Sequence, residues 1–191
     1  MAWLFTLGIH LALYYLLYTG LSYKYPHTLG ILLPLPILNG VFLYFYAVEL
    51  MGNIRLNAKA ITIHLLPFLL LIGLAVPFYM LSAREKVQVF QSGGSGFEWY
   101  SQLQLPLILI SGFGYSLATV WQIYLHRKRI FNNFSNIEKI MLRWLEYLAI
   151  GMGMIWLLSV FFEDQIIFGG VVLFVLFIGL FGINQVPLIY S

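Results

Sequence analysis

Six blocks of nearly uninterrupted apolar residues divide the chain, and short polar segments separate them. The transmembrane helices predicted from them cover residues 2–21, 31–51, 61–81, 100–125, 136–162 and 166–186. A helix rises about 1.5 Å per residue, so about 20 apolar residues cross a hydrocarbon core of about 30 Å. Each block is apolar all round rather than striped, which is typical of helices that contact lipid or other helices on every side. The pattern predicts an all-α, integral membrane bundle of about six transmembrane helices.

The composition excludes an ordinary soluble domain. Charged residues make up 9% of the 191 residues, hydrophobic residues make up 61%, and the mean hydropathy is +0.89. Soluble domains carry about 25% charged residues, enough to cover a surface that faces water. The lipid bilayer is therefore the first predicted partner, and residues 1–191 are predicted to form a single transmembrane domain. The absence of cysteine excludes disulfides, thiolate metal sites and a cysteine nucleophile.

Basic residues predict the orientation of this domain. With six spans, both termini share one side of the membrane, and the loops on that side hold seven Lys and Arg residues against three on the other. Because short cytoplasmic loops carry an excess of basic residues, both termini are predicted to be cytoplasmic. The seven are Arg55, Lys59, Arg127, Lys128, Arg129, Lys139 and Arg143, and the three are Lys24, Arg84 and Lys86.

The segment 82–99 is the longest stretch on the predicted outer side. Its Ser-Gly-Gly-Ser-Gly run at residues 92–96 indicates a flexible tip. The candidate signal-sensing residues of this loop are Arg84, Glu85, Lys86 and Glu98. The alternative is a solvated connector, since loops concentrate polar residues in any case.

The segment 132–144 has more predicted local structure than any other loop. Ser135 and Glu138 fit a capping box, so the fifth helix is expected to start near Asn136, before the membrane. The candidate cytoplasmic coupling residues are Phe134, Ser135, Glu138, Arg143 and Trp144. The preceding basic run, residues 127–129, suits a topology signal that attracts anionic lipid, and no direct contact with nucleic acid is expected from it.

Polar residues inside the blocks are His10, Asn39 and His64. Hydrogen bonding between helices is the simplest role for them, and metal ligation or proton relay stays open. The chain lacks the GxSxG, HExxH, Walker A and dinucleotide-binding signatures, so no enzyme activity and no cofactor are predicted. Seven aromatic residues near block ends are expected to form an interfacial belt: Trp3, Tyr23, Tyr25, Trp99, Tyr100, Tyr124 and Trp144.

Several sequence stretches resemble one known family. They are Tyr25-Pro26-His27, the run from Pro34 to Tyr46, the run from His64 to Phe68, residues 133–145 and residues 182–185. Together they resemble the N-terminal multi-helix membrane domain of bacterial AraC-type, helix-turn-helix transcriptional regulators. The resemblance covers nearly the whole chain, and residues 134–145 are its most specific part.

The resemblance implies a sensor or anchor domain in the bacterial inner membrane. Such a domain would pass a signal by helix rearrangement to a cytoplasmic DNA-binding domain that follows in cis. The family usually has at least one more helix before the first block. Since the DNA-binding domain is not within residues 1–191 and the C-terminus is predicted to be cytoplasmic, we expect the reading frame to continue past Ser191. A small transporter or channel-like subunit is the alternative function. The sequence leaves the stimulus and the oligomeric state open, and a homodimer is one of the alternatives.

Overall fold

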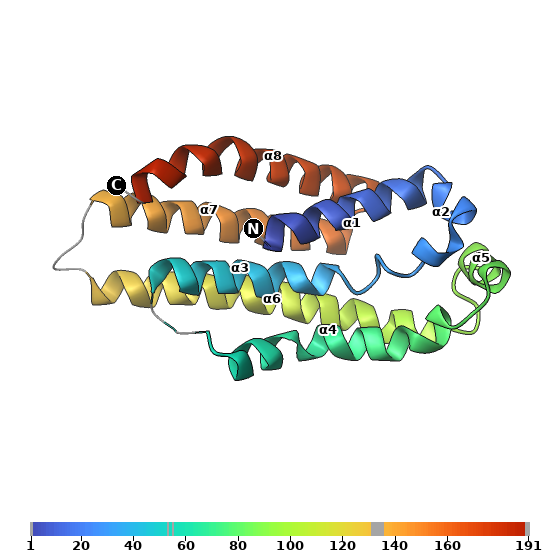
Figure 1. Cartoon of the computed structure of the whole chain (residues 1–191). Coiled ribbons are helices and arrows are strands. Elements are labelled where there is room, and N and C mark those ends of the chain that lie inside the picture. The colour runs from blue at the N-terminus through green and yellow to red at the C-terminus, as the bar shows by residue number, and fades with distance from the viewer. Residues whose placement is uncertain (1, 53, 55, 131–135, 190–191) are drawn as a thin grey trace. The chain divides into compact units, whose positions relative to one another are not determined.

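A computed structural model of the chain describes residues 2–52, 54, 56–130 and 136–189, with the side chains of 136–138 and 182–189 outside the description. The described residues are mostly helical, with turns between the helices, and contain no strand (Figure 1). The elements are α1 (Ala2–Tyr18), α2 (Leu21–Lys24), the 3-10 helix η1 (Pro26–Thr28), α3 (Pro36–Met51), α4 (Ala58–Tyr79), α5 (Ala83–Gln91), α6 (Glu98–Arg129), α7 (Asn136–Phe161) and α8 (Asp164–Ile189).

Four stretches of helix are long and apolar enough to cross a membrane. They are Ala58–Tyr79, Glu98–Arg129, Lys139–Phe161 and Asp164–Phe181. The all-helical class predicted from the sequence is thereby confirmed, and four apolar helices of spanning length support the membrane assignment. Helices α1 and α3, with 17 and 16 residues, are apolar but shorter. At about 1.5 Å per residue they reach roughly 25 Å, so the count of six spans stays a prediction.

Local chemistry explains why these two helices are short. The residue after Thr19 is Gly20, which adopts a left-handed conformation with φ of 75° and separates α1 from α2. Glycine is suited to this conformation because it has no Cβ to clash with the backbone. Helix α3 begins at Pro36, whose missing N–H is tolerated in the first helical turn. The apolar residues before Pro36 form turns instead of helix.

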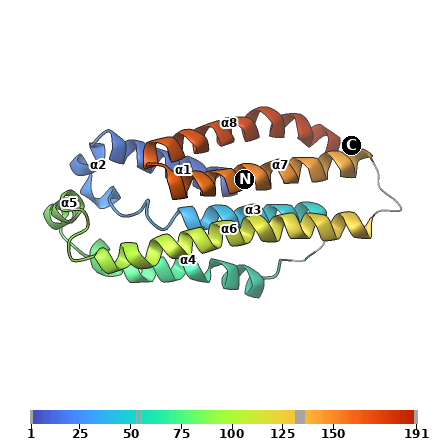
Figure 2. The same cartoon turned by 180° about the vertical axis from the view of Figure 1, so that it is seen from behind.

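The chain divides into two compact units, and the division falls inside α3 and α6. Unit 1 is Met1–Asn39 with Ala58–Ser111, and unit 2 is Gly40–Asn57 with Gly112–Ser191. Within unit 1, α5 lies beside η1 and α2, at the end where α4 finishes and α6 begins (Figures 1 and 2). Two side chains of α6 tie it to the start of α3: Gln104 Nε2 donates to Leu33 O at 2.6 Å, and Ser111 Oγ donates to Ile37 O at 3.4 Å.

Unit 2 is built around α7 and α8, which run side by side (Figure 2). Small residues bring the helices close together. A Cβ on Gly151 of α7 would lie 2.7 Å from the ring of Phe174 on α8. The other side of α7 packs on α3 and α6 through an apolar cluster, which we call the unit 2 core: Ala47, Met51, Ile123, Leu142 and Leu145.

The predicted aromatic belt divides into two groups. Trp3, Tyr100 and Trp144 are only 8%, 5% and 4% exposed, so they pack within the protein. Trp144, for example, stacks on Phe177 with ring centroids 5.5 Å apart, and its Nε1 donates to the hydroxyl of Tyr46 at 3.3 Å. The others are exposed, as residues of an interfacial belt would be: Tyr23, Tyr25, Trp99 and Tyr124.

Candidate functional site

The segment between α4 and α6 is largely a capped helix, where the sequence analysis expects a loop. Helix α5 starts with a full capping box: Ser82 N donates to Glu85 Oε2 at 2.8 Å, and Glu85 N donates to Ser82 Oγ at 3.4 Å. The hydrogen bonds from Ser82 hold the pKa of Glu85 below its ordinary value. Two mutual bonds satisfy donors that a helix start leaves unpaired, which is why so short a helix forms here.

Lys86 faces inward, unlike its neighbours on α5. Arg84 and Glu85 are exposed, whereas Lys86 is 4% exposed and its Nζ lies 3.2 Å from Nδ1 of His27 in η1. A charged lysine amine can only donate, so in that state Nδ1 of His27 is the acceptor. Glu98, the fourth predicted sensing residue, is exposed at the start of α6 and accepts from Gly96 N at 3.0 Å. The four residues therefore do not converge on one point, and Lys86 anchors α5 to η1.

The inner face of α5 lines a partly open cavity of about 270 Å³ in unit 1, which we call the aromatic pocket. Helices α4, α5 and α6 and the turns beside them provide its walls. Phe78 lies at the centre of the aromatic side chains, with its ring 5.7 Å from that of Phe90 and 5.6 Å from that of Phe97. The lining residues are Gly30, Leu33, Ala75, Phe78, Tyr79, Val89, Phe90, Gly93, Gly94, Phe97, Tyr100 and Ser101.

One wall of the aromatic pocket depends on a glycine. Gly30 has φ of 84°, and a Cβ there would lie 2.6 Å from the ring of Phe78. The Gly30 carbonyl also accepts a hydrogen bond of 3.2 Å from the hydroxyl of Tyr79. Both the backbone conformation and the close approach of the ring require the absence of a side chain at this position.

Tyr100 is one of three lining residues of the aromatic pocket with a side-chain hydroxyl, beside Tyr79 and Ser101. The residue is 5% exposed, and its buried hydroxyl has no hydrogen-bond partner among the described residues. A buried hydroxyl without a partner destabilises the folded state by about 1–3 kcal/mol. A mostly apolar and aromatic lining with a few polar groups is the usual composition of a site for a small organic ligand.

Comparison of the chain with protein-family models, with curated proteins and with solved structures found no match in any of the three. The aromatic pocket is therefore interpreted from its own geometry.

The predicted coupling segment is described only in part. Phe134, Ser135 and the side chain of Glu138 lie outside the described residues, so the second predicted capping box stays a prediction. Arg143 is exposed, and Trp144 is buried in unit 2. A different residue pair links the neighbouring helices: Arg127 Nη2 of α6 lies 2.8 Å from Glu146 Oε1 of α7.

The polar residues predicted inside the spans differ in burial. His10 and Asn39 are 5% and 6% exposed, and His64 is half-buried. The Oδ1 atom of Asn39 lacks a hydrogen-bond partner among the described residues. Within the part of the chain that the structure describes, no group of three or more His, Cys, Asp or Glu residues could hold a metal ion.

Sequence reasoning missed the aromatic residues of the pocket. The available signal was Ser82 followed three residues later by Glu85, which is the same capping pattern that was recognised at Ser135. A helix starting there places Lys86, Val89 and Phe90 on one face, because residues three and four apart are neighbours on a helix. That face is the one turned inward.

Proposed function

We propose that the chain is the membrane sensor and anchor domain of a bacterial transcriptional regulator, and that its signal is a small aromatic molecule bound in the aromatic pocket. About six helices would hold it in the inner membrane, with both termini in the cytoplasm and a DNA-binding domain following in cis. The resemblance in residues 134–145 supports the regulator. The aromatic pocket, with the unpaired hydroxyl of Tyr100 beside it, is the observation that supports the sensor role.

The size and lining of the aromatic pocket define the ligand class. Its volume of about 270 Å³ compares with about 150 Å³ for an apolar protein cavity that binds benzene. A two-ring aromatic molecule therefore matches the available space. One hydroxyl or carbonyl group on that molecule would give Tyr100 the hydrogen bond it lacks, once a rotation of the ring turns the buried hydroxyl toward the pocket. The ligand would act by binding better to the state in which α5 is closed, thereby shifting the equilibrium between two helix arrangements.

The interior of unit 2 supports a sensor over the transporter or channel-like alternative. The buried face of α6 carries the polar residues Ser116 and Thr119, but Ile123 follows on the same face and belongs to the unit 2 core. Ile123 is 2% exposed, and Leu142 and Leu145 of the same cluster are fully buried. A transport pathway needs continuous polar or water-filled space. The apolar core interrupts the polar face of α6 after Thr119.

The purified chain in detergent is expected to bind 2-naphthol with a Kd on the order of 0.1 mM, the affinity of an efficient ligand of this size. Tyr100→Phe should weaken binding of 2-naphthol about three- to tenfold, the value of one lost hydrogen bond. Naphthalene fills the same space but cannot use the hydroxyl of Tyr100, so its binding should not change in this variant. Isothermal titration calorimetry or fluorescence titration measures both ligands.

Tyr124→Phe is the matched control, because it removes the same hydroxyl from an exposed tyrosine of α6 that does not line the pocket. Failure of the wild-type chain to bind either probe would refute the ligand-sensing function. Equal weakening by both tyrosine variants would remove Tyr100 from the site. Flux of 2-naphthol across liposomes that depends on the chain would instead favour the transporter.

The proposed topology predicts that cysteines introduced at Ser95 and at Asn133 are labelled from opposite sides of the inner membrane. The chain has no native cysteine, so the labelling has no background. Ser95 lies in the exposed turn between α5 and α6 and should react with a membrane-impermeant maleimide added to intact spheroplasts. The cysteine at Asn133 should react only after the membrane is opened. Labelling of both positions in intact spheroplasts would contradict the six-span arrangement.

A further inference from the structure

One face of α6 changes from apolar to aromatic to cationic along its length in unit 2. Leu117, Trp121 and Tyr124 are 69%, 58% and 54% exposed, and the exposed Lys128 follows. The spacing of four, three and four residues places all four side chains within about 60° of one another on a helix of 3.6 residues per turn. The rings of Trp121 and Tyr124 contact each other, with centroids 5.6 Å apart.

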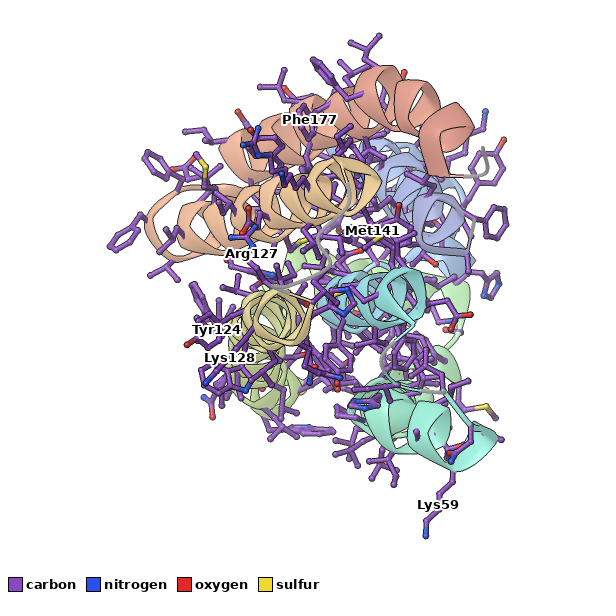
Figure 3. The ribbon with its side chains drawn as sticks, turned by 90° about the vertical axis from the view of Figure 1, so that its left-hand side faces the viewer. Lys59, Tyr124, Arg127, Lys128, Met141 and Phe177 are labelled. Atoms are coloured by element: carbon purple, nitrogen blue, oxygen red, sulfur yellow. The ribbon has the colours of Figure 1, made fainter. Side chains whose placement is uncertain are left out.

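Arg127 belongs to a different face of the same helix. Its guanidinium pairs with Glu146 of α7 at 2.8 Å, so its charge is largely balanced inside unit 2. Figure 3 shows Arg127 between α6 and α7, with Tyr124 and Lys128 on the outer side of α6. Lys128 therefore presents its charge outward, directly beyond the two exposed aromatic rings.

We infer that this face of α6 binds the headgroup of an anionic phospholipid at Lys128, with the acyl chains lying along Trp121 and Leu117. The order of the side chains matches the order of the layers in a bilayer leaflet. Trp and Tyr favour the boundary between hydrocarbon and headgroups, and a lysine near a helix end extends its amine to the phosphates. Trp121 and Lys128 are about 10 Å apart along the helix axis. With Trp121 at the edge of the hydrocarbon, this distance places the amine of Lys128 in the headgroup region.

The test follows the fluorescence of Trp121 in the purified full chain in detergent micelles. Phosphatidylglycerol and phosphatidylcholine, each carrying dibrominated acyl chains, are titrated separately, because bromine quenches nearby tryptophan. The quenching that is lost in Trp121→Phe is the signal of this site. Phosphatidylglycerol should reach half-maximal quenching at about fivefold lower mole fraction than phosphatidylcholine, the preference that one lysine near anionic lipid provides.

Lys128→Gln should abolish the preference for phosphatidylglycerol, whereas Lys59→Gln should retain it. Lys59 is an exposed lysine in the first turn of α4, so the two variants change the net charge equally. Inorganic phosphate should not displace the brominated lipid, because it lacks the acyl chains. The inference is overturned if the two lipids quench alike, if both lysine variants lose the preference equally, or if Trp121→Phe leaves the quenching unchanged.

Discussion

Replacing Gly112 with alanine is expected to lower the free energy of unfolding by about 1–3 kcal/mol, as overpacking of a closely packed interior does. A Cβ at Gly112 of α6 would lie 2.2 Å from the indole ring of Trp156 on α7. That ring is 4% exposed, so the side chain has little room to move aside. Equilibrium unfolding in mixed detergent micelles, followed by tryptophan fluorescence, measures the change.

Gly114→Ala is the matched control, two residues along the same helix. A Cβ at Gly114 meets nothing within 4 Å. Alanine in place of a helical glycine lowers the conformational entropy of the unfolded chain, so this variant should be stabilised by roughly 0.5–1 kcal/mol. Equal stability of the two variants would show that α6 and α7 are not as closely packed as the structure has them.

Replacing His27 with alanine is expected to destabilise unit 1 by about 1–3 kcal/mol, because it leaves a buried ammonium without its partner. His27 is the only hydrogen-bond partner of Lys86 Nζ among the described residues, and Lys86 is 4% exposed. Lys86→Met alone should have a much smaller effect. Methionine keeps all but the last atom of the lysine side chain and removes the charge, and the exposed His27 can bond to water instead.

The double variant tests whether the charge of Lys86 causes the loss of stability in His27→Ala. His27→Ala with Lys86→Met should recover most of the stability lost in His27→Ala, because no buried charge then remains unpaired. Arg84→Met on the exposed face of α5 is the control and should be close to neutral. Additive effects of the two substitutions would contradict the anchoring of α5 by this pair. Because α5 provides Val89 and Phe90 to the aromatic pocket, His27→Ala should also weaken binding of 2-naphthol.

The sequence determined the helical membrane class without reference to tertiary structure. Block length and hydropathy are local properties, and an apolar helix such as Ala58–Tyr79 needs nothing from distant residues to satisfy its backbone in lipid. Helix bounds at glycine and proline, as at Gly20 and Pro36, also follow from local backbone chemistry. The capping box at Ser82 is also a local pattern. The Gly-rich run at residues 92–96 instead led to the prediction of a loop over this segment.

Only the tertiary structure decided which side chains face inward, because lipid and protein interior are almost equally apolar. Hydropathy alone therefore could not separate the buried Trp144 from the exposed Tyr124, although both stand near block ends. The pairing of Lys86 with His27 joins residues 59 positions apart, and the bond from Tyr79 to Gly30 joins residues 49 apart. Such pairs leave no periodic trace in the sequence, so the aromatic pocket exists only where α4, α5 and α6 meet.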